Sequence, residues 1–515
     1  MQTLLAIDDV SLPFRKNVHL QLSTPTVRPE PVLMPSAFES DAPDNLAAHF
    51  YGTVLHDEGT FRMWYYACHW GKNPDWPPKL MQQIARTTLW AGPQCPLYAG
   101  PICYAESDDG IVWRKPPLGQ VLFKGSRANH ALAIPHVLIG AADVIKDTDD
   151  PDPARRYKMV YQFFPDQADP PISDEYGDRP TIALACSPDG LVWTVTSIPF
   201  RGQFIEQSSF YRHGGRYVVQ YHVMDSWSGW RSEGGAKCGR VGVARVSSDW
   251  DNWPDLITET FALAEPEDHA LRGMDGPYDQ VHMGVGAASF GNVCVGLYGM
   301  WHNADNKRSY GEISCDFGLV VSNDGVHFRE PARGRRFIRR EDSPVTPMPG
   351  LNAPTVLCQG NGILNVGDQT RIYHSRWRNV GHDDATLRHY YAEVALATLP
   401  RDRWGALTLN DSAPGDDVTE GVICSATLTL SDRCELRINA DTSPGGLSVD
   451  LLDEHFRPVA GFSGGAIQGE GLSCPVHWPG RSISELAGQS VRVQIRLRRQ
   501  GDATPRVYAM YLATV

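Results

Sequence analysis

Four segments of the chain repeat one short pattern: an apolar run, a turn marked by Asp, and an aromatic residue. The segments are CYAESDDGIVWRKP (103–116), ALACSPDGLVWTV (183–195), GVARVSSDWDNWPD (242–255) and GLVVSNDGVHFREP (318–331), with a degenerate fifth, VALATLPRDRWGAL, at 394–407. The marker residues are Asp109, Asp189, Asp249, Asp324 and Asp402, which lie 60 to 80 residues apart. Repeats of this length, each with several short strands, are typical of a propeller or a solenoid.

Within each repeat, the alternation of apolar and polar residues predicts a strand followed by a tight turn. We expect the marker Asp to accept hydrogen bonds from turn amides, and the Gly that follows it in three repeats to adopt a positive φ. The aromatic residue then covers the junction between neighbouring repeats. These aspartates are therefore predicted to be structural.

A second strand pair precedes each marker. GTVLHDEGTFRMWYYA and IEQSSFYRHGGRYVVQYHV are two examples, and each reads as an apolar strand, a polar turn and a second apolar strand, which is a hairpin. A hairpin and a marker pair make one four-stranded unit, and there are five. The sequence thus predicts an all-β chain with a five-bladed β-propeller as the catalytic domain over 1–405, including an N-terminal extension. After a linker-like run, alternating segments predict a small β-sandwich over 421–515.

Charge and composition exclude several classes of partner. The formal charge is −13, from 47 Lys and Arg against 60 Asp and Glu, which argues against duplex nucleic acid and anionic membranes. The arginine-rich run at 333–340 is followed at once by Glu341 and Asp342, so we expect a solvated hairpin face. No apolar stretch reaches the roughly 18 residues of a membrane span.

Cysteine usage and the first residues indicate a cytoplasmic location. The 11 cysteines are scattered without a CxxC pair, which favours a reducing compartment. The start, MQTLLAIDDV, carries two acids where a secretory signal has a basic region. The chain has no HExxH, P-loop or dinucleotide motif, and the acidic run at 147–150 fails the EF-hand pattern. No cofactor and no metal are therefore expected.

The predicted site lies where the first strand of each unit begins, near the propeller axis. Loops on that face carry aromatic side chains suited to sugars, Trp70 and Trp227 among them. Carboxylates from several units can there converge on one small ligand. Glycoside cleavage needs such a pair, one acid to protonate the leaving oxygen and one carboxylate to attack or to activate water.

The segment IEQSSFYRHGGRYVVQYH resembles the third-blade segment of the five-bladed β-propeller glycosidases, a group that contains invertase-like fructosidases and arabinanase or β-xylosidase-like enzymes. That segment typically begins IEGP. The resemblance implies that Glu206 is the general acid. The whole layout, with VIKDxxDPDPARRYKM and SPDGLVWT, is similar to uncharacterised bacterial invertase-like proteins that end in a β-sandwich.

The same resemblance implies further acids. In the second blade of these glycosidases an Asp orients the acid and modulates its pKa, and the nearest acid here is Asp143, two residues out of register. In the first blade the base or nucleophile would fall near Tyr51, where HFYGTV has no acid. Asp44, just upstream, or Asp279 of GPYDQVHMG are the candidates to replace it. His49, Tyr51 and His282 lie near strand starts and are expected, with Trp70 and Trp227, to hold sugar hydroxyls or rings.

The sequence therefore predicts a cytoplasmic glycoside hydrolase that cleaves a small furanoside or pyranoside oligosaccharide with two carboxylates. Its partner is a carbohydrate, and homo-oligomer formation is left open. A sugar-binding propeller without catalysis is one alternative, because the first-blade acid is missing. A glycoside phosphorylase is another, which requires a basic phosphate pocket for which Arg179 and His282 are the candidates.

Overall fold

The computed structural model describes residues 2–71, 73–76, 100–136, 139–163, 181–200, 206–224, 240–261, 281–302, 310–380, 384–410, 418–442, 445–467, 471–500 and 504–514. Among these residues the regular structure is almost wholly β-strand, with one four-residue α-helix, α3 (Asp384–Leu387), and three short 3-10 helices. The prediction of an all-β chain is confirmed. No helix in the described ranges is long and apolar enough to cross a membrane.

The strands between residues 47 and 400 fall into five successive units. The first three are separate antiparallel sheets ordered as the chain runs, and the fourth and last are joined in one nine-stranded sheet through a single parallel strand pair. The first has β5 (Ala47–Asp57), β6 (Thr60–Cys68) and β7 (Ile102–Ser107); the second has β8 (Ile139–Lys146), β9 (Tyr157–Phe163), β10 (Thr181–Ser187) and β11 (Thr194–Phe200). The third has β12 (Glu206–His213), β13 (Arg216–Met224), β14 (Arg240–Ser247) and β15 (Thr258–Phe261). The fourth has β16 (Val281–Ser289), β17 (Cys294–His302), β18 (Ser314–Ser322) and β19 (Arg336–Ile338). The last has β20 (Thr355–Cys358), β21 (Ile363–Val366), β22 (Gln369–Arg378) and β23 (Tyr391–Pro400).

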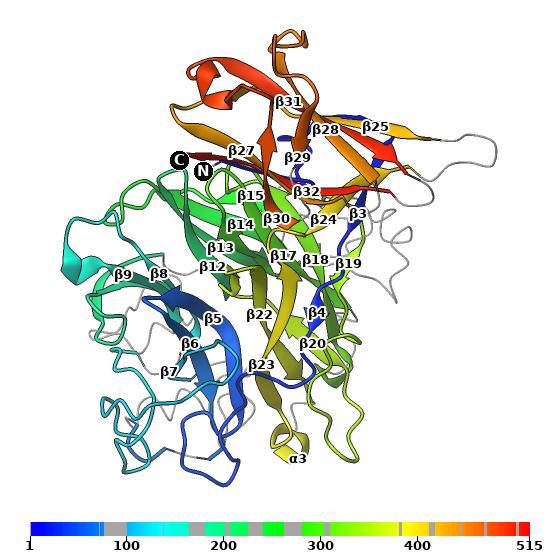
Figure 1. Cartoon of the computed structure of the whole chain (residues 1–515). Helices are drawn as coiled ribbons and strands as arrows, with labels where there is room; N and C mark the ends of the chain where they lie inside the picture. The colour runs from blue at the N-terminus through cyan, green and yellow to red at the C-terminus, as the bar shows by residue number, and fades with distance from the viewer. Residues whose placement is uncertain are drawn as a thin grey trace, which may run out of the picture.

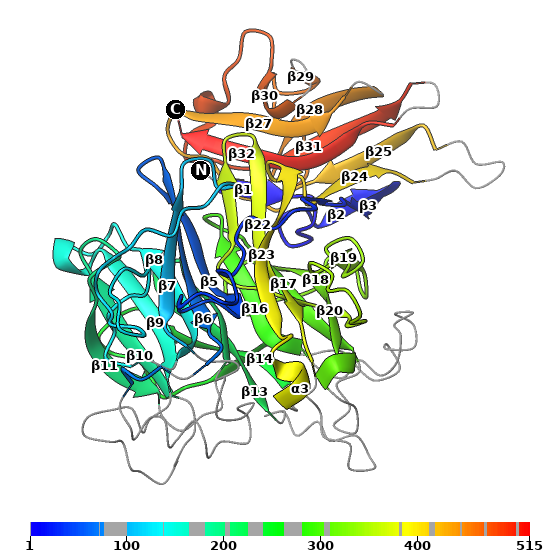
Figure 2. The same cartoon turned by 90° about the horizontal axis from the view of Figure 1, so that it is seen from below.

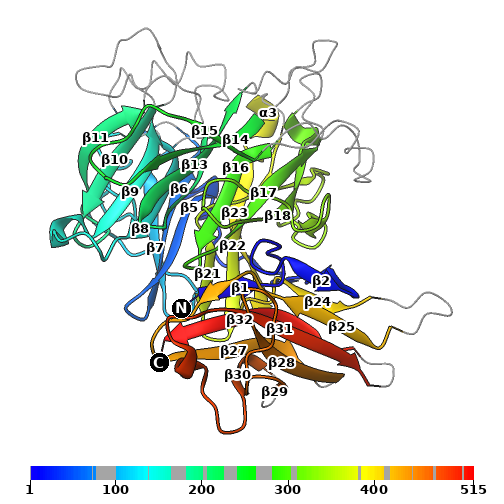
Figure 3. The same cartoon turned by 90° about the horizontal axis from the view of Figure 1, so that it is seen from above.

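The innermost strands of these units form a closed ring. β5 contacts β8, β8 contacts β12, β12 contacts β16, and β21 contacts both β16 and β5. Asn361 ties the centre of the ring together, because its amide exchanges hydrogen bonds with the Phe210 backbone at 3.1 and 2.6 Å. Its own backbone bonds to Gly52 and Val54 of β5. Figures 2 and 3 show the units around this shared centre from two sides.

The marker turns at Asp109, Asp189 and Asp324 are built as the sequence predicts, whereas the carboxylate of Asp402 accepts from the side chains of Asn365 and Tyr511. Asp109 Oδ1 accepts hydrogen bonds from the amides of Ile111 and Val112 at 2.8 and 2.9 Å. Asp189 does the same in the second unit, and Gly110 and Gly190 have φ of +74° and +76°.

An aromatic side chain of one unit donates to the turn carbonyl of the next. Trp64 of the first unit bonds to Gly190 O at 2.8 Å, Tyr211 of the third to Gly325 O at 2.7 Å, and Tyr373 of the last to Gly110 O at 2.8 Å. These bonds satisfy buried turn carbonyls and set the spacing between neighbouring units.

The N-terminal strands pair both with the last unit of the ring and with the C-terminal strands of the chain. β4 (Thr26–Val27) pairs with β23 as an outer strand of the last unit. β1 (Gln2–Leu5), β2 (Phe14–Lys16) and β3 (Val18–Leu22) pair instead with strands from the end of the chain. Figure 1 shows the two chain termini close together, beside β32 and β27.

The C-terminal strands build a second body at the end of the ring remote from α3 (Figures 1 and 2). They are β24 (Gly405–Leu409), β25 (Glu420–Cys424), β26 (Leu428–Thr429), β27 (Cys434–Asp441), β28 (Gly445–Asp453), β29 (Gly465–Ile467), β30 (Gly471–His477), β31 (Ser490–Arg499) and β32 (Arg506–Thr514). One apolar core lies among them, to which Ile423, Val493, Ile438 and Met510 contribute. Asp402 joins the two bodies, since it accepts from Tyr511 at 2.8 Å and from Asn365 of β21 at 2.7 Å.

Candidate active site

Asp143 lies on β8, the inner strand of the second unit, and its side chain is 1% exposed. Gln207 of β12 donates from Nε2 to Asp143 Oδ2 at 3.1 Å. The other oxygen, Oδ1, is buried without a hydrogen-bond partner in the described structure. A buried carboxyl with one held oxygen and one unengaged oxygen is unusual, because buried polar atoms are generally satisfied.

The surroundings of Asp143 favour its neutral form. Burial raises the pKa of its carboxyl to about 8, and the hydrogen bond from Gln207 opposes this only in part. No charged group among the described residues contributes to that pKa. A carboxyl that keeps its proton near neutral pH is what a general acid requires.

Glu206 begins β12 and lies opposite His222 of β13 in the strand register. It is the neighbour of Gln207, so its backbone is one residue away from the side chain that touches Asp143. The structure therefore brings the backbone of Glu206 next to the Asp143 contact. The side chain of Glu206 lies outside the described residues, as do Asp279 and Trp227. His282 pairs with Gly299 in β16, and its side chain is likewise not described.

The first unit presents aromatic groups where the resemblance expects an acid. His49 is fully buried, stacks on Tyr66 with ring centroids 4.4 Å apart, and lies edge-on to Trp377 at 4.5 Å. Its Nε2 is 3.1 Å from the hydroxyl of Tyr390. Burial lowers the pKa of His49 well below its ordinary value, so the ring is neutral. Tyr51, 4% exposed, packs on Trp377 at 4.9 Å.

Asp44 is held in a different network, away from Asp143. It is fully buried, and its oxygens bond to Ser36 at 2.6 Å, Tyr65 at 2.9 Å and Lys115 at 2.5 Å. Burial raises the pKa of Asp44, but His130 and Lys115 together outweigh it and leave the pKa well below its ordinary value. Asp44 is thus the ionised partner of Lys115.

Trp70 lies just beyond the end of β6 and is half-buried, with its ring 6.2 Å from that of Phe38. Its backbone amide donates to Asn45 at 2.7 Å. The structure places it near the first unit and does not bring it into contact with Asp143.

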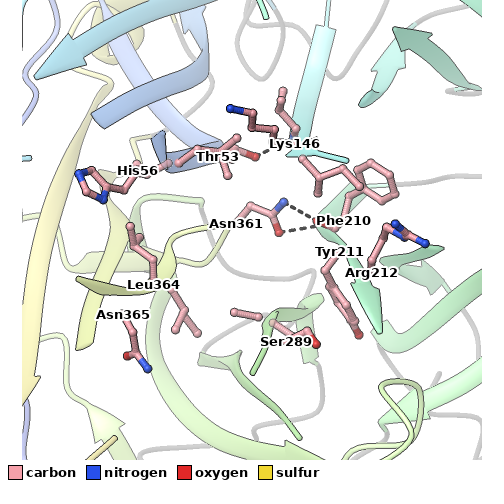
Figure 4. Close-up of a pocket in the computed structure, with 17 residues that line it drawn as sticks. Thr53, His56, Lys146, Phe210, Tyr211, Arg212, Ser289, Asn361, Leu364 and Asn365 are labelled. Atoms are coloured by element: carbon pink, nitrogen blue, oxygen red, sulfur yellow. Dashed lines mark hydrogen bonds between the residues drawn. The ribbon is translucent and has the colours of Figure 1, made fainter. Parts of the chain in front are cut away.

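A cavity of about 400 Å³ lies within the ring toward the C-terminal ends of β5, β8, β12 and β16, with residues of β21 completing its lining. Figure 4 shows Asn361 and its bonds to Phe210 at one side of this space, with Thr53 and Tyr211 nearby. Its two cationic side chains are already engaged: Lys146 pairs with Asp57 and Glu58, and Arg212 pairs with Asp147 and Asp149. On β8, Asp143 is the residue directly before Val144, the first residue of that strand to line the cavity. No group of three or more His, Cys, Asp or Glu suited to a metal ion occurs among the described residues.

Gln207 is the site residue that the sequence analysis missed. The available signal was its place directly after Glu206, where the glycosidase segment has Gly.

No family model and no curated protein matches the chain. Solved structures do match. A family 117 glycoside hydrolase from Zobellia galactanivorans is 12% identical, with a TM-score of 0.39, over 74% of this chain and 91% of that one. A β-1,2-mannobiose phosphorylase from Listeria innocua is 12% identical, with a TM-score of 0.41, over 74% and 97%. A GH32 β-fructofuranosidase from Bombyx mori is 11% identical, with a TM-score of 0.38, over 95% of each chain. Two of these three structures are glycoside hydrolases and one is a phosphorylase.

Proposed function

We propose that the chain is a glycoside hydrolase in which Asp143 is the proton donor and Glu206 the second carboxylate. The observation that carries this proposal is the buried carboxyl of Asp143, whose pKa of about 8 keeps it protonated at neutral pH. Its Oδ1 is not engaged by any described group. Glycoside cleavage requires such an acid together with an ionised carboxylate.

The roles follow from the chemistry of the bond. As the glycosidic C–O bond breaks, its electron pair goes to the leaving oxygen, which takes the proton of Asp143. Glu206 attacks the anomeric carbon or deprotonates the water that does so. The sequence resemblance assigns the acid to Glu206, whereas the raised pKa of Asp143 supports the reverse assignment.

The substrate in this proposal is a small furanoside or pyranoside oligosaccharide. The sequence resemblance supports this substrate class, whereas Tyr51 and Trp377 are 4% and 2% exposed and belong to an apolar core. The neutral His49 behind them adds no charge that would select an anionic ligand.

The fold assigned with this function is a five-bladed propeller over most of 1–405 and a β-sandwich over 421–515. The closed contact ring of five inner strands supports the first assignment. The shared core of the C-terminal strands supports the second, with the N-terminal strands β1 to β3 added to it by pairing. The scattered cysteines support a cytoplasmic location.

The test is a screen of aryl glycosides and oligosaccharides, with products analysed by NMR in the presence and absence of inorganic phosphate. We expect hydrolysis that does not depend on phosphate. Asp143→Asn and Glu206→Gln should each lower kcat on an oligosaccharide by about 10²–10⁴. Asp108→Asn is the matched control, because Asp108 is exposed and pairs only with Arg114 at the surface.

Each contrary outcome has its own meaning. Undiminished turnover of an oligosaccharide, whose sugar leaving group needs protonation, by Asp143→Asn would overturn the proposal. Phosphate-dependent turnover would identify a phosphorylase, and calorimetric sugar binding without product would identify the non-catalytic alternative.

A further inference from the structure

Gln207 bridges two units of the ring at the carboxyl of Asp143. Its side chain is fully buried, and Nε2 donates both to Asp143 Oδ2 and to the backbone oxygen of Val160. Asp143 and Val160 are direct partners in the β8–β9 register. The side-chain amide of Gln207, in the third unit, therefore bonds to both members of one cross-strand pair of the second unit, Asp143 and Val160.

The orientation of this amide follows from its partners. The backbone oxygen of Val160 can only accept a hydrogen bond, so the NH₂ end of Gln207 must face it. The same NH₂ end then faces Asp143 Oδ2, which must act as an acceptor. A neutral carboxyl with Oδ2 as its accepting oxygen carries its proton on Oδ1, the oxygen without a described partner.

We propose that Gln207 is a positioning residue that directs the proton of Asp143 onto Oδ1 and stabilises the carboxylate left after that proton is transferred. This inference rests on the proposed function. Hydrogen bonds to an ionised acceptor are stronger than those to a neutral one, so the Gln207 bond strengthens as Asp143 loses its proton. The resembling glycosidase segment has Gly at this place and lacks such a donor.

The other ionisable groups around Asp143 are accounted for by strand. Those on the strands packed against β8 are His49, Tyr51, His56 and Asp57 on β5, Arg62, Tyr65, Tyr66 and Cys68 on β6, Tyr157, Lys158 and Tyr161 on β9, and Glu206, Tyr211, Arg212 and His213 on β12. None of the described ones contributes to the pKa of Asp143, for which burial and the Gln207 bond are the causes. Gln207 is thus the side chain whose replacement should move that pKa.

The experiment compares unfolding free energies across pH for each variant and for the same variant carrying Asp143→Asn. The difference between the two members of a pair isolates the titration of Asp143. In the natural chain this difference in unfolding free energy should stop changing with pH near pH 8. We call the pH at which it stops changing the break. Gln207→Met has similar bulk and no donor, so this break should move upward by about one pH unit, a tenfold higher proton affinity.

Two further variants complete the test. Gln162→Met is the matched control, because Gln162 is buried on the adjacent β9 and does not contribute to the pKa of Asp143; its break should stay in place. Should Gln207→Met not fold, Gln207→Glu replaces the neutral amide with a second carboxyl, which also raises the pKa of Asp143. The alkaline limb of kcat/KM should move in the same direction as the break.

The outcomes separate this inference from the proposed function. A break that stays in place in the Gln207 variants overturns the inference, even where turnover depends on Asp143. A break that moves in a protein without glycoside turnover overturns the proposed function and leaves the Gln207 contact as a control of Asp143 ionisation.

Discussion

Replacing Asp143 with Asn should remove a large pH dependence of stability. The folded chain keeps the Asp143 proton up to about pH 8, whereas the unfolded chain releases it near the ordinary value of 3.8. The stabilisation from this group is complete below pH 3.8 and is lost as pH rises toward 8. Between these limits the free energy of unfolding falls by about 1.4 kcal/mol per pH unit.

From pH 5 to pH 7.5, the natural chain should thus lose about 3 kcal/mol relative to Asp143→Asn. Asn resembles the neutral carboxyl in shape and does not titrate. The assay is urea unfolding of both proteins at several pH values, followed by tryptophan fluorescence and circular dichroism. Other titrating groups are common to both chains and cancel in the difference. Parallel stability curves would refute the claim that Asp143 is buried in its neutral form.

Two further substitutions test the architecture by urea unfolding. Gly110→Ala should lower the free energy of unfolding by about 2–3 kcal/mol, because the φ of Gly110 is +74° and the added methyl would lie 2.4 Å from the Tyr373 hydroxyl. Gly214→Ala should lower it by only about 1 kcal/mol, because Gly214 also has a positive φ but has open space around it. Equal losses of stability would contradict the packing argument. Asp44→Asn should cost about 3 kcal/mol near pH 7, since it leaves Lys115 without its carboxylate, and a loss below about 1 kcal/mol would contradict the assigned ion pair.

The strand units were predictable because their signals are local. The turn at Asp109 depends on residues within four positions of it, and the same pattern recurs at Asp189. Hairpin alternation is local too, so β12 and β13 follow directly from the printed residues. These features are set by backbone preferences that act within one repeat.

The pairing of the chain ends was not predictable in this way. β1 pairs with β32, about 500 residues later in the chain, and no short pattern encodes that choice. The same limit applies to the site. The contact between Gln207 and Asp143 joins two units, so it depends on how the inner strands pack rather than on either segment alone.

The central claim is that Asp143 donates the proton to the leaving group. The most direct measurement is the dependence of kcat/KM on leaving-group acidity, using a series of aryl glycosides of one sugar that the enzyme cleaves. An acidic phenol departs without help from an acid, so Asp143→Asn should cleave such substrates nearly as well as the natural enzyme. Its rate should fall steeply as the phenol becomes less acidic. An equal loss for every leaving group would contradict the account.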